Sequence, residues 1–367
     1  LKTGKNNMNK RFLIASGGTG GHFYPGFALG EEFKRQGCEV LFVVRKDDPA
    51  AKVLSAHGLS YKEIDFMGFP RSVNPVRHVK FVCKLVKSLL QTRQILRVFR
   101  PDVAIGTGGY ISFPLIFMAH FMGVKTAVHD SNACLGLANK VCGKFADLFM
   151  LGLPTTEKVK NGVLTSTPVR AEFGLSANRA TQLQALKLDP AKPTVLVVGG
   201  SQGAKDLNNA VVACAKVFSN WQFIHITGER WFESVRGLYA GLSNAAVLPY
   251  SHEIYTLMKA VDLIICRSGA STLAELVCCK LPAVLVPFPH AAANHQYYNA
   301  KIFAEAGCAQ IVLDDDQLPT RLSSVFKGLT QGQVSAKLAA MRAGYDKLAL
   351  PNPLTAAQTI AERLKSL

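Results

Sequence analysis

The sequence predicts an α/β protein whose two halves are alike, each a parallel β-sheet with helices packed on it. Short apolar runs typical of buried strands recur along the chain, and glycine-rich turns and helix-like segments follow them. The pattern of strand, glycine turn and helix at residues 13–21 returns at residues 194–204. These observations predict two Rossmann-like domains.

The apolar runs also place the individual elements. We expect strands at residues 11–15, 40–44, 103–105, 126–129, 148–151, 194–198, 222–227, 246–248, 263–266, 283–287 and 310–313. We expect a disordered leader over residues 1–10, a first domain over 11–166, a second over 167–350 and a terminal helix over 354–367. The helix after the first glycine turn should begin near Pro25, because proline is tolerated in a first helical turn.

Composition narrows the class of protein. The chain has 367 residues, 49% hydrophobic and 18% charged, which suits two globular domains. No apolar run reaches the roughly 18–20 residues that cross a bilayer, and residues 1–10 lack the apolar core of a secretory signal, so we expect a cytoplasmic protein. The nine cysteines form no C-x-x-C pair, so we expect reduced thiols in the core and neither zinc nor disulfides.

The formal charge of +17 indicates an anionic partner. Nucleic acid, anionic lipid and an anionic substrate all remain open on charge alone. Much of this charge lies between Phe66 and Pro101, a stretch without a single acidic residue. Helical spacing gathers five of its apolar residues on one face, with lysines toward the edges: Val82, Leu85, Val86, Leu89 and Leu90.

Such a basic amphipathic stretch fits the surface of an anionic membrane. The alternative is an ordinary surface helix whose apolar side belongs to the core. Nucleic acid is a weaker interpretation, because no stacking-aromatic or base-reading module accompanies the charge. The residues expected to touch the membrane are Phe66, Met67, Phe69, Arg71, Arg77, Lys80, Lys84 and Lys87.

The stretch from Asp262 to Ala300 carries the most informative pattern. A buried strand breaks at Arg267-Ser268-Gly269-Ala270, and a helix follows from Thr272. A turn of this kind leaves backbone N–H groups that can hold a phosphate. The next strand leads to Asn294-His295-Gln296, and open α/β sheets bind ligands at the carboxyl ends of neighbouring strands. Together these features predict a nucleotide-sugar site.

Glu275 fits two roles at the start of this helix. Its carboxylate could accept hydrogen bonds from a ribose diol beside the phosphates. Thr272-x-x-Glu275 also matches a capping box, in which the carboxylate serves the start of the helix. The sequence leaves both roles open.

Polar turns also follow three strands of the first half, at residues 17–22, 106–110 and 129–132. The glycines of Gly17-Gly18-Thr19-Gly20-Gly21-His22 allow a ligand to approach the backbone closely. They do not match G-x-G-x-x-G, and no Walker A lysine follows, which argues against NAD and NTPase sites. The three turns predict a ligand-facing rim on the first half.

The motifs, taken in order, resemble those of the MurG family of bacterial glycosyltransferases, which add N-acetylglucosamine to lipid I to make lipid II. The resemblance covers nearly the whole chain after Lys10. It is carried by the turns at residues 17–22, 108–110 and 199–204, by Pro168-Val169-Arg170, by residues 267–275, and by Gln296 before Asn299.

The resemblance implies a GT-B fold, with two Rossmann-like domains facing across a cleft. It implies inverting transfer of N-acetylglucosamine from UDP-N-acetylglucosamine to the 4-hydroxyl of the N-acetylmuramyl-pentapeptide of undecaprenyl-linked lipid I. The first domain would bind the acceptor and receive the terminal helix, and the second would bind the UDP-sugar. The enzyme would be a peripheral protein on the cytoplasmic face of the bacterial inner membrane, with cell-wall or division machinery as further partners and no nucleic acid.

Carried over by resemblance, the donor site would include Thr19, Gly20, Gly21, Asn132, Arg170, Ser201, Ser251, Ala270, Ser271, Thr272, Leu273, Ala274, Glu275 and Gln296. The acceptor side would include Gly108, Gly109 and Tyr110. The chain departs from the usual family pattern at four positions, which are Asp130 for Glu, Ser131 for Gln, Thr167 for Asn and Ser271 for Leu, and residues 134–136 lack the common Pro.

His22 is the candidate general base for the acceptor hydroxyl, because an imidazole titrates near the working pH. The alternative is a helix-start histidine that only binds a phosphate or caps the helix. Backbone amides near Ser201 and Ala270, with Arg170, would stabilise the departing UDP in place of a metal. No D-x-D motif stands at a strand end, and the acidic run Asp314-Asp315-Asp316 is far in sequence from the motifs. We therefore expect neither a metal nor a cofactor.

Three other functions compete with this interpretation. A related glycosyltransferase would use another membrane lipid, such as diacylglycerol, as acceptor. A UDP-N-acetylglucosamine epimerase would need a pair of catalytic carboxylates, and the sequence offers no convincing pair. A basic adaptor without enzymatic activity would leave the glycine turns, Arg170, Glu275 and Gln296 without a purpose.

Overall fold

The computed structural model describes residues 10–18, 20–70, 74–200 and 202–367. The chain forms two compact units, one of residues up to Arg170 together with Leu350–Leu367, and one of Ala171–Ala349. We call them unit 1 and unit 2. The sequence placed the division after residue 166, whereas the contacts place it after Arg170. The expected leader lies outside the described residues except for Lys10.

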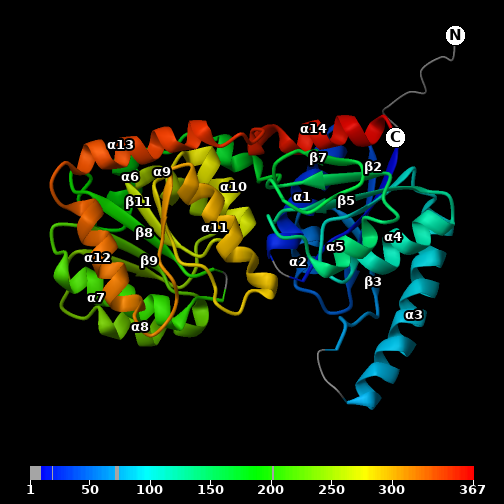
Figure 1. The fold of residues 1–367 in the computed structure, drawn as a ribbon, viewed down its shortest axis with the longest axis horizontal. Coiled ribbons are helices and arrows are strands. Elements are labelled where there is room, and N and C mark those ends of the chain that lie inside the picture. Colours follow the sequence, from blue (N-terminus) through cyan, green and yellow to red (C-terminus); the bar gives the residue numbers. More distant parts are fainter. Residues whose placement is uncertain (1–9, 19, 71–73, 201) are drawn as a thin grey trace, which may run out of the picture. The chain divides into compact units, whose positions relative to one another are not determined.

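Unit 1 is a parallel sheet covered by helices (Figure 1). Among the described residues its strand order is β3-β2-β1-β4-β5-β6-β7. The strands are β1 (Arg11–Ala15), β2 (Glu39–Arg45), β3 (Ser60–Ile64), β4 (Val103–Gly106), β5 (Lys125–Asp130), β6 (Leu148–Leu151) and β7 (Gly162–Leu164). The helices are α1 (Gly20–Arg35), α2 (Ala50–Ala56), α3 (Pro75–Phe99), α4 (Ser112–Phe121), α5 (Leu137–Cys142) and α14 (Pro353–Lys365).

Both faces of this sheet are buried, because successive residues of a strand point to opposite sides. Phe12 and Ile14 of β1 belong to a core that includes residues of α1 and α14, whereas Leu13 and Ala15 belong to one that includes residues of α3 and α4. This explains why the central strands are continuous apolar runs. Through Ile360 and its neighbours, α14 packs in the first of these cores, so the chain returns to its first unit.

Unit 2 repeats the architecture, with the strand order β10-β9-β8-β11-β12-β13 and all pairs parallel. Its strands are β8 (Thr194–Val198), β9 (Gln222–Ile226), β10 (Ala245–Leu248), β11 (Leu263–Cys266), β12 (Ala283–Leu285) and β13 (Ala309–Ile311). Its helices are α6 (Arg179–Ala185), α7 (Lys205–Val217), α8 (Phe232–Leu238), α9 (Ile254–Ala260), α10 (Ala270–Cys279), α11 (His295–Glu305), α12 (Leu318–Thr330) and α13 (Val334–Gly344). Short 3-10 turns lie at Ala171–Gly174, Glu229–Trp231, Ala292–Asn294 and Tyr345–Lys347.

The sequence analysis did not predict the two edge strands of unit 1, β3 and β7. The residues of β3 are mostly exposed, and β7 has only three residues, so neither shows a buried apolar run. The start of α1 was also wrong, since this helix begins at Gly20 and holds Pro25 inside it. The hydroxyls of Ser16 and Thr107 donate to the carbonyl of His22, which strengthens this first part of the helix.

The strand order fixes where a ligand can bind. Each sheet reverses its order once, between β1 and β4 in unit 1 and between β8 and β11 in unit 2. Open α/β sheets bind ligands at the carboxyl edge beside such a switch point. The turns that follow these four strands are the glycine turns at residues 17–22, 106–110 and 199–204 and the turn at 267–270.

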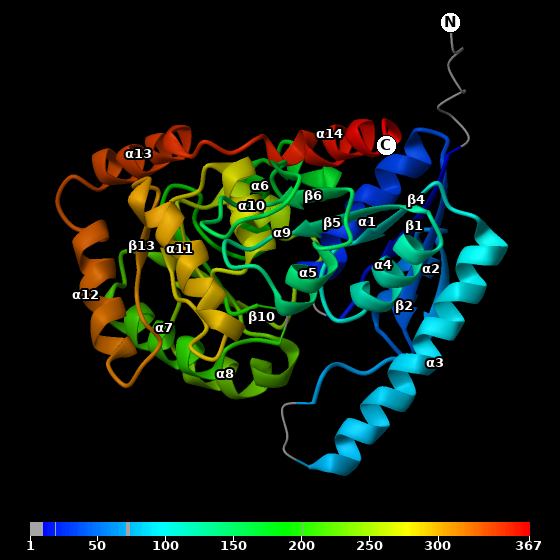
Figure 2. The same cartoon turned by 45° about the vertical axis from the view of Figure 1, so that its right-hand side comes forward.

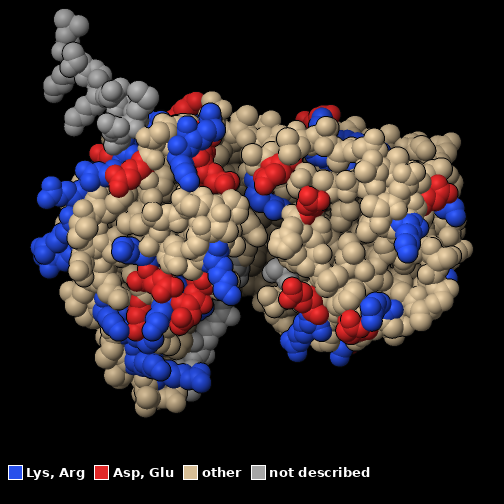
Figure 3. Space-filling model, turned by 180° about the vertical axis from the view of Figure 1, so that it is seen from behind, with Lys and Arg blue, Asp and Glu red and all other residues tan. Residues whose placement is uncertain are grey.

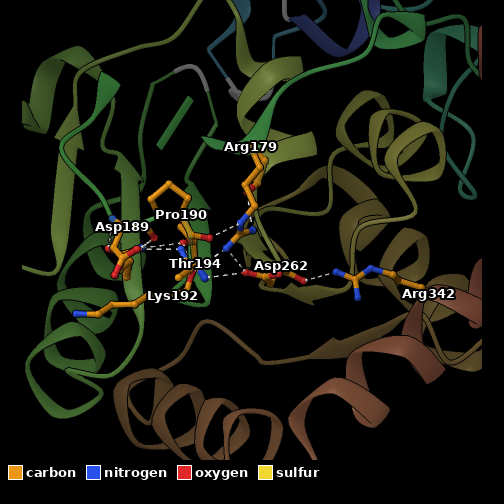
Figure 4. Close-up of polar contacts among 10 residues, drawn as sticks. Arg179, Asp189, Pro190, Lys192, Thr194, Asp262 and Arg342 are labelled. Carbon is orange, nitrogen blue, oxygen red and sulfur yellow. Dashed lines mark hydrogen bonds and ion pairs between the residues drawn. The ribbon is translucent and has the colours of Figure 1, made fainter. Parts of the chain in front are cut away.

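The amino edge of the unit 2 sheet is closed by a polar cluster around Arg179 (Figure 4). Its guanidinium donates to the carbonyls of Pro190, Lys192 and Ala260 at 2.7–3.1 Å and to the carboxylate of Asp262 at 2.9 Å. The Asp262 carboxylate also accepts from the Thr194 amide at 2.9 Å. The cluster thus joins α6 to the starts of β8 and β11, on the edge opposite to the turns.

Candidate active site

In unit 1 the first two glycine turns meet around His22. This residue lies in the first turn of α1, and a Cβ atom at Gly108 would lie only 2.3 Å from its Nδ1 atom. Gly108 and Gly109 also have φ angles of 106° and 71°, which favour glycine. The second turn therefore makes room for the imidazole, which is a more direct role than the general place on the acceptor side that the sequence suggested. Tyr110 at its end is 38% exposed and packs beside Gly68.

The first glycine turn is held by Asp48, which the sequence analysis did not single out. This buried carboxylate accepts from the amides of Gly18 at 2.8 Å and Ala50 at 3.0 Å. The Gly18 amide is thus already bonded within the protein. Gly20 and Gly21 lie in the first turn of α1, and Thr19 lies outside the described residues.

Asp130, one of the departures from the family pattern, organises the loop that carries Asn132. Its buried carboxylate accepts from both the backbone and the side-chain N–H of Asn132, at 3.0 and 3.3 Å. It also accepts from Gly136 N at 2.8 Å and Asn139 Nδ2 at 3.0 Å. An aspartate is therefore long enough to close this loop. Asn132 itself remains partly exposed at the carboxyl end of β5.

His129 and Arg170 complete this rim. Burial lowers the pKa of His129, so its imidazole is neutral. The contact of its Nε2 atom with the Ser166 carbonyl at 3.1 Å raises the pKa but has the smaller effect. Arg170 is partly exposed, with its guanidinium carbon 5.4 Å from the ring centroid of Tyr24 on α1. Arg170 therefore lies at the same helix start as His22.

In unit 2 the helix α10 begins at Ala270, with Gly269 as its N-cap and no side-chain capping bond. The capping box at Thr272 and Glu275 is therefore wrong, because Thr272 already lies inside the helix. The Ser271 hydroxyl is buried and is among the few such atoms of the described residues without a hydrogen-bond partner.

Two members of the predicted donor set do not fit. Leu273 is fully buried, and its amide already donates to Gly269 O at 3.0 Å, so neither its side chain nor its N–H can reach a ligand. The Ala274 side chain is also buried. The first-turn amides of Ala270, Ser271 and Thr272 have no acceptor within this helix, so they are the groups of α10 that could bind a phosphate.

An ion pair between Arg267 and Asp314 joins the strand ends around this helix. The Arg267 guanidinium donates to Asp314 Oδ2 at 2.6 Å and to the carbonyls of Val286 and Pro287 at 3.1 and 3.3 Å. The two side chains are only 11% and 7% exposed. Asp314 belongs to the acidic run that seemed remote from the motifs. The pairing of β12 with β13 brings it to them.

Gln296 is oriented by two contacts. Its Oε1 atom accepts from the Phe288 amide at 3.0 Å, and its carbonyl accepts from the Ser268 hydroxyl at 2.8 Å. Because Oε1 is engaged, Gln296 offers its amide N–H groups to a ligand. Ser251 is partly buried after β10, between Tyr250 and His252, whose rings lie 4.8 Å apart. Ser201, in the third glycine turn, lies outside the described residues.

The basic stretch forms α3, which has two apolar sides and extends beyond the other elements of unit 1 (Figures 1 and 2). Phe81 and Leu85 pack against the core, whereas Val82, Val86 and Leu90 are each more than half exposed. The five residues expected on one face thus divide between two. Lysines and arginines gather over this part of unit 1 (Figure 3).

Three of the expected membrane contacts need correction or restriction. Phe66 is buried in the core at 6% exposure, so its prediction as a membrane contact is wrong. Lys84 and Lys87 donate to Asp65 at 2.6 and 3.0 Å, and these bonds lower the pKa of Asp65 to about 2. Met67 is partly exposed, and Phe69 is exposed with its ring against Phe81. Both Arg77 and Lys80 are exposed. Arg71 lies outside the described residues.

The nine cysteines are thiols, and none of them is in a disulfide. Within the described ranges no group of three or more His, Cys, Asp or Glu could hold a metal ion. No helix in the described part of the chain has both the length and the apolar character to cross a bilayer.

Two Rossmann-like units, each with polar or glycine-rich turns at the carboxyl edge of its parallel sheet, have the architecture of the GT-B fold. Family models agree, since the glycosyltransferase family 28 N-terminal domain matches residues 12–150 and the C-terminal domain matches residues 194–349. The UDP-N-acetylglucosamine--N-acetylmuramyl-(pentapeptide) pyrophosphoryl-undecaprenol N-acetylglucosamine transferase of Elusimicrobium minutum is 49% identical over 98% of this chain and 100% of its own. Its namesake from Halothermothrix orenii is 34% identical over 87% and 90%.

A solved structure extends the comparison. The crystal structure of MurG from Acinetobacter baumannii matches with a TM-score of 0.80 at 26% identity, over 98% of this chain and 100% of that one. The chain belongs to the MurG family within glycosyltransferase family 28. The resemblance inferred from the motifs is thus confirmed.

Replacing Asp314 by Asn should destabilise unit 2 by about 3 kcal/mol, because it leaves the buried Arg267 cation without a counter-ion. The matched control is Asp315→Asn in the same acidic run, whose ion pair with Arg321 is 42–43% exposed and should contribute less than about 1 kcal/mol. The free energy of unfolding in urea measures both. Equal losses of unfolding free energy in the two variants would show that the buried Arg267–Asp314 pair stabilises the protein no more than the exposed pair does.

Proposed function

We propose that this chain transfers N-acetylglucosamine from UDP-N-acetylglucosamine to the 4-hydroxyl of the N-acetylmuramyl-pentapeptide of lipid I, giving lipid II for peptidoglycan synthesis. The observation that carries the proposal is the 49% identity, over 98% of this chain and 100% of the relative, to an enzyme named for this transfer. The turns at both switch points support it, because they put backbone amides where the two substrates' phosphates would bind.

Unit 2 would bind the donor. The first-turn amides of α10 and the unpartnered Ser271 hydroxyl would hold the pyrophosphate with the turn at residues 199–204. Glu275 lies in the second turn of α10, one helical turn from those amides, and would accept from the ribose hydroxyls. Gln296 would donate to the donor through its amide N–H groups.

Unit 1 would bind the acceptor and supply the base. The imidazole of His22 would take the proton of the acceptor hydroxyl as that oxygen attacks the anomeric carbon and UDP leaves from the opposite side. The fit of its ring against Gly108 limits its rotation, which favours proton transfer in one direction. Backbone amides and Arg170 would stabilise the charge on the departing UDP, so we expect no metal requirement.

The outward side of α3 would dock unit 1 on the cytoplasmic face of the inner membrane, where it would reach the lipid-linked acceptor. Its exposed valines and Leu90 would enter the headgroup region, and exposed Arg77 and Lys80 would attract anionic lipid. Lys84 and Lys87 would contribute less, because both neutralise Asp65.

The transfer is tested directly with radiolabelled UDP-N-acetylglucosamine and a short-chain lipid I analogue in the presence of EDTA. We expect labelled lipid II, formed at the same rate with and without the chelator. Loss of activity in EDTA that Mg²⁺ restores would overturn the metal-free mechanism. If the chain binds UDP but labels diacylglycerol instead of the analogue, the donor half stands and the acceptor is wrong.

Replacing His22 by Ala should lower kcat by about 100-fold or more and leave the affinity for UDP unchanged, because the base acts only in the chemical step.

Glu275→Ala should instead raise the KM for the donor by about tenfold, through lost ribose contacts. Steady-state kinetics and calorimetry with UDP measure both, and His57→Ala at the end of α2 is the control. Weakened UDP binding in the His22 variant would assign that residue to phosphate binding.

Replacing Val82 and Val86 together by Ser should weaken binding to vesicles of phosphatidylglycerol and phosphatidylcholine by about tenfold, because two exposed apolar side chains no longer enter the lipid. Val217→Ser is the control, since this valine is 68% exposed on α7 of unit 2. Sedimentation with the vesicles measures binding. Unchanged binding of the double variant would rule out this side of α3 as the docking surface.

A further inference from the structure

A chain of buried polar groups runs through unit 2 behind the third glycine turn. It links Tyr239 after α8, His225 in β9, Asn208 in α7 and the backbone of Thr227 after β9. These residues are 0–5% exposed. His225 Nδ1 lies 2.8 Å from Tyr239 Oη, His225 Nε2 lies 3.1 Å from Asn208 Oδ1, and Asn208 Nδ2 lies 3.0 Å from Thr227 O. The chain is continuous from a helix on the sheet to the end of a central strand.

Each hydrogen bond in this chain can point in only one direction. The Thr227 carbonyl can only accept, so the Asn208 amide nitrogen must face it, and the Asn208 oxygen must face His225. His225 therefore carries its proton on Nε2. Burial lowers the pKa of His225 to about 3, so the ring is neutral and its Nδ1 atom accepts from the Tyr239 hydroxyl. The Tyr239 O–H thus begins the chain and the Thr227 carbonyl ends it.

The end of this chain is the floor of the glycine turn. A Cβ atom at Gly203 would lie 2.0 Å from Thr227 O, and one at Gly228 would lie 2.6 Å from Gly203 N. Gly203 and Gly228 have φ angles of 71° and 82°, and the Gly203 amide closes the turn by donating to Gly200 O at 2.9 Å. The position of the Thr227 carbonyl therefore sets the shape of the turn.

We propose that Tyr239, His225 and Asn208 are positioning residues for the donor. They hold the Thr227–Gly228 floor, which fixes Gly203 and the bond from its amide to Gly200 O that closes the third glycine turn. The inference rests on the proposed function, because it takes this turn to bind the donor. None of the three side chains reaches the ligand, since all are buried. A purely structural role predicts a loss of stability alone, whereas a positioning role also predicts weaker binding of UDP.

Unit 2 offers a matched control for this proposal. Tyr345 is 4% exposed, and its hydroxyl also donates to a buried carbonyl, that of Leu281. Leu281 precedes β12, at the amino edge of the sheet, away from the glycine turns. Tyr239→Phe and Tyr345→Phe therefore remove the same atom from equally buried places, but only the first interrupts the chain to the turn.

The experiment measures UDP binding by calorimetry, thermal unfolding, and the KM values for donor and acceptor. Tyr239→Phe should raise both the Kd for UDP and the donor KM by about three- to tenfold, with the acceptor KM and kcat near wild type. Tyr345→Phe should lower the unfolding temperature without changing the Kd for UDP. His225→Gln, which can still donate to Asn208, should retain more UDP affinity than His225→Leu.

Three outcomes would overturn the inference. A folded Tyr239→Phe protein could bind UDP as tightly as wild type, Tyr345→Phe could weaken UDP binding equally, or His225→Leu could match His225→Gln in affinity. Failure of the wild-type chain to bind UDP at millimolar concentration would refute the proposed function itself. Wild-type binding with an unaffected Tyr239 variant would refute only the positioning role.

Discussion

At Gly203 the backbone passes so close to the Thr227 carbonyl that no side chain fits between them, and the end of the third glycine turn depends on this approach. The same constraint recurs in unit 1, where the missing side chain of Gly108 makes room for the His22 imidazole. In both places the glycine allows a second segment of the chain to lie at the carboxyl edge of the sheet.

Buried carboxylates provide the other half of this construction. Asp48 holds the first glycine turn, Asp130 closes the loop of Asn132, and Asp314 pairs with Arg267 beside α10. Each carboxylate accepts hydrogen bonds from N–H groups of the protein, so its negative charge is balanced within the fold.

The two apolar sides of α3 differ in what they contribute to the fold. Phe81 and Leu85 bury one side in the core of unit 1, which keeps the helix in place without the outer side. The packing of the core therefore does not depend on Val82, Val86 and Leu90, which are exposed. Asp65 directly precedes the stretch without acidic residues and forms ion pairs with two of its lysines, Lys84 and Lys87. The positive charge of the helix is therefore partly neutralised, which the composition of the stretch alone does not reveal.

The sequence by itself determined the class of the fold, the central strands, the turns that follow them and the family. These features rest on local patterns, because burial on both faces of a strand and a positive φ in a turn leave their marks on neighbouring residues. The edge strands β3 and β7 left no such mark, since they are exposed or very short.

Only the tertiary structure decided which side chains hold the site together. Asp48 and Gly18 are 30 residues apart in the sequence, and Arg267 and Asp314 are 47 apart, so no local pattern predicts either contact. The fold also decided against Phe66 at the membrane, against Leu273 at the donor and against the capping box at Thr272. The two polar pairs could not be predicted because the order of parallel strands sets which distant segments meet, and hydrophobic burial does not specify the polar partners that they find there.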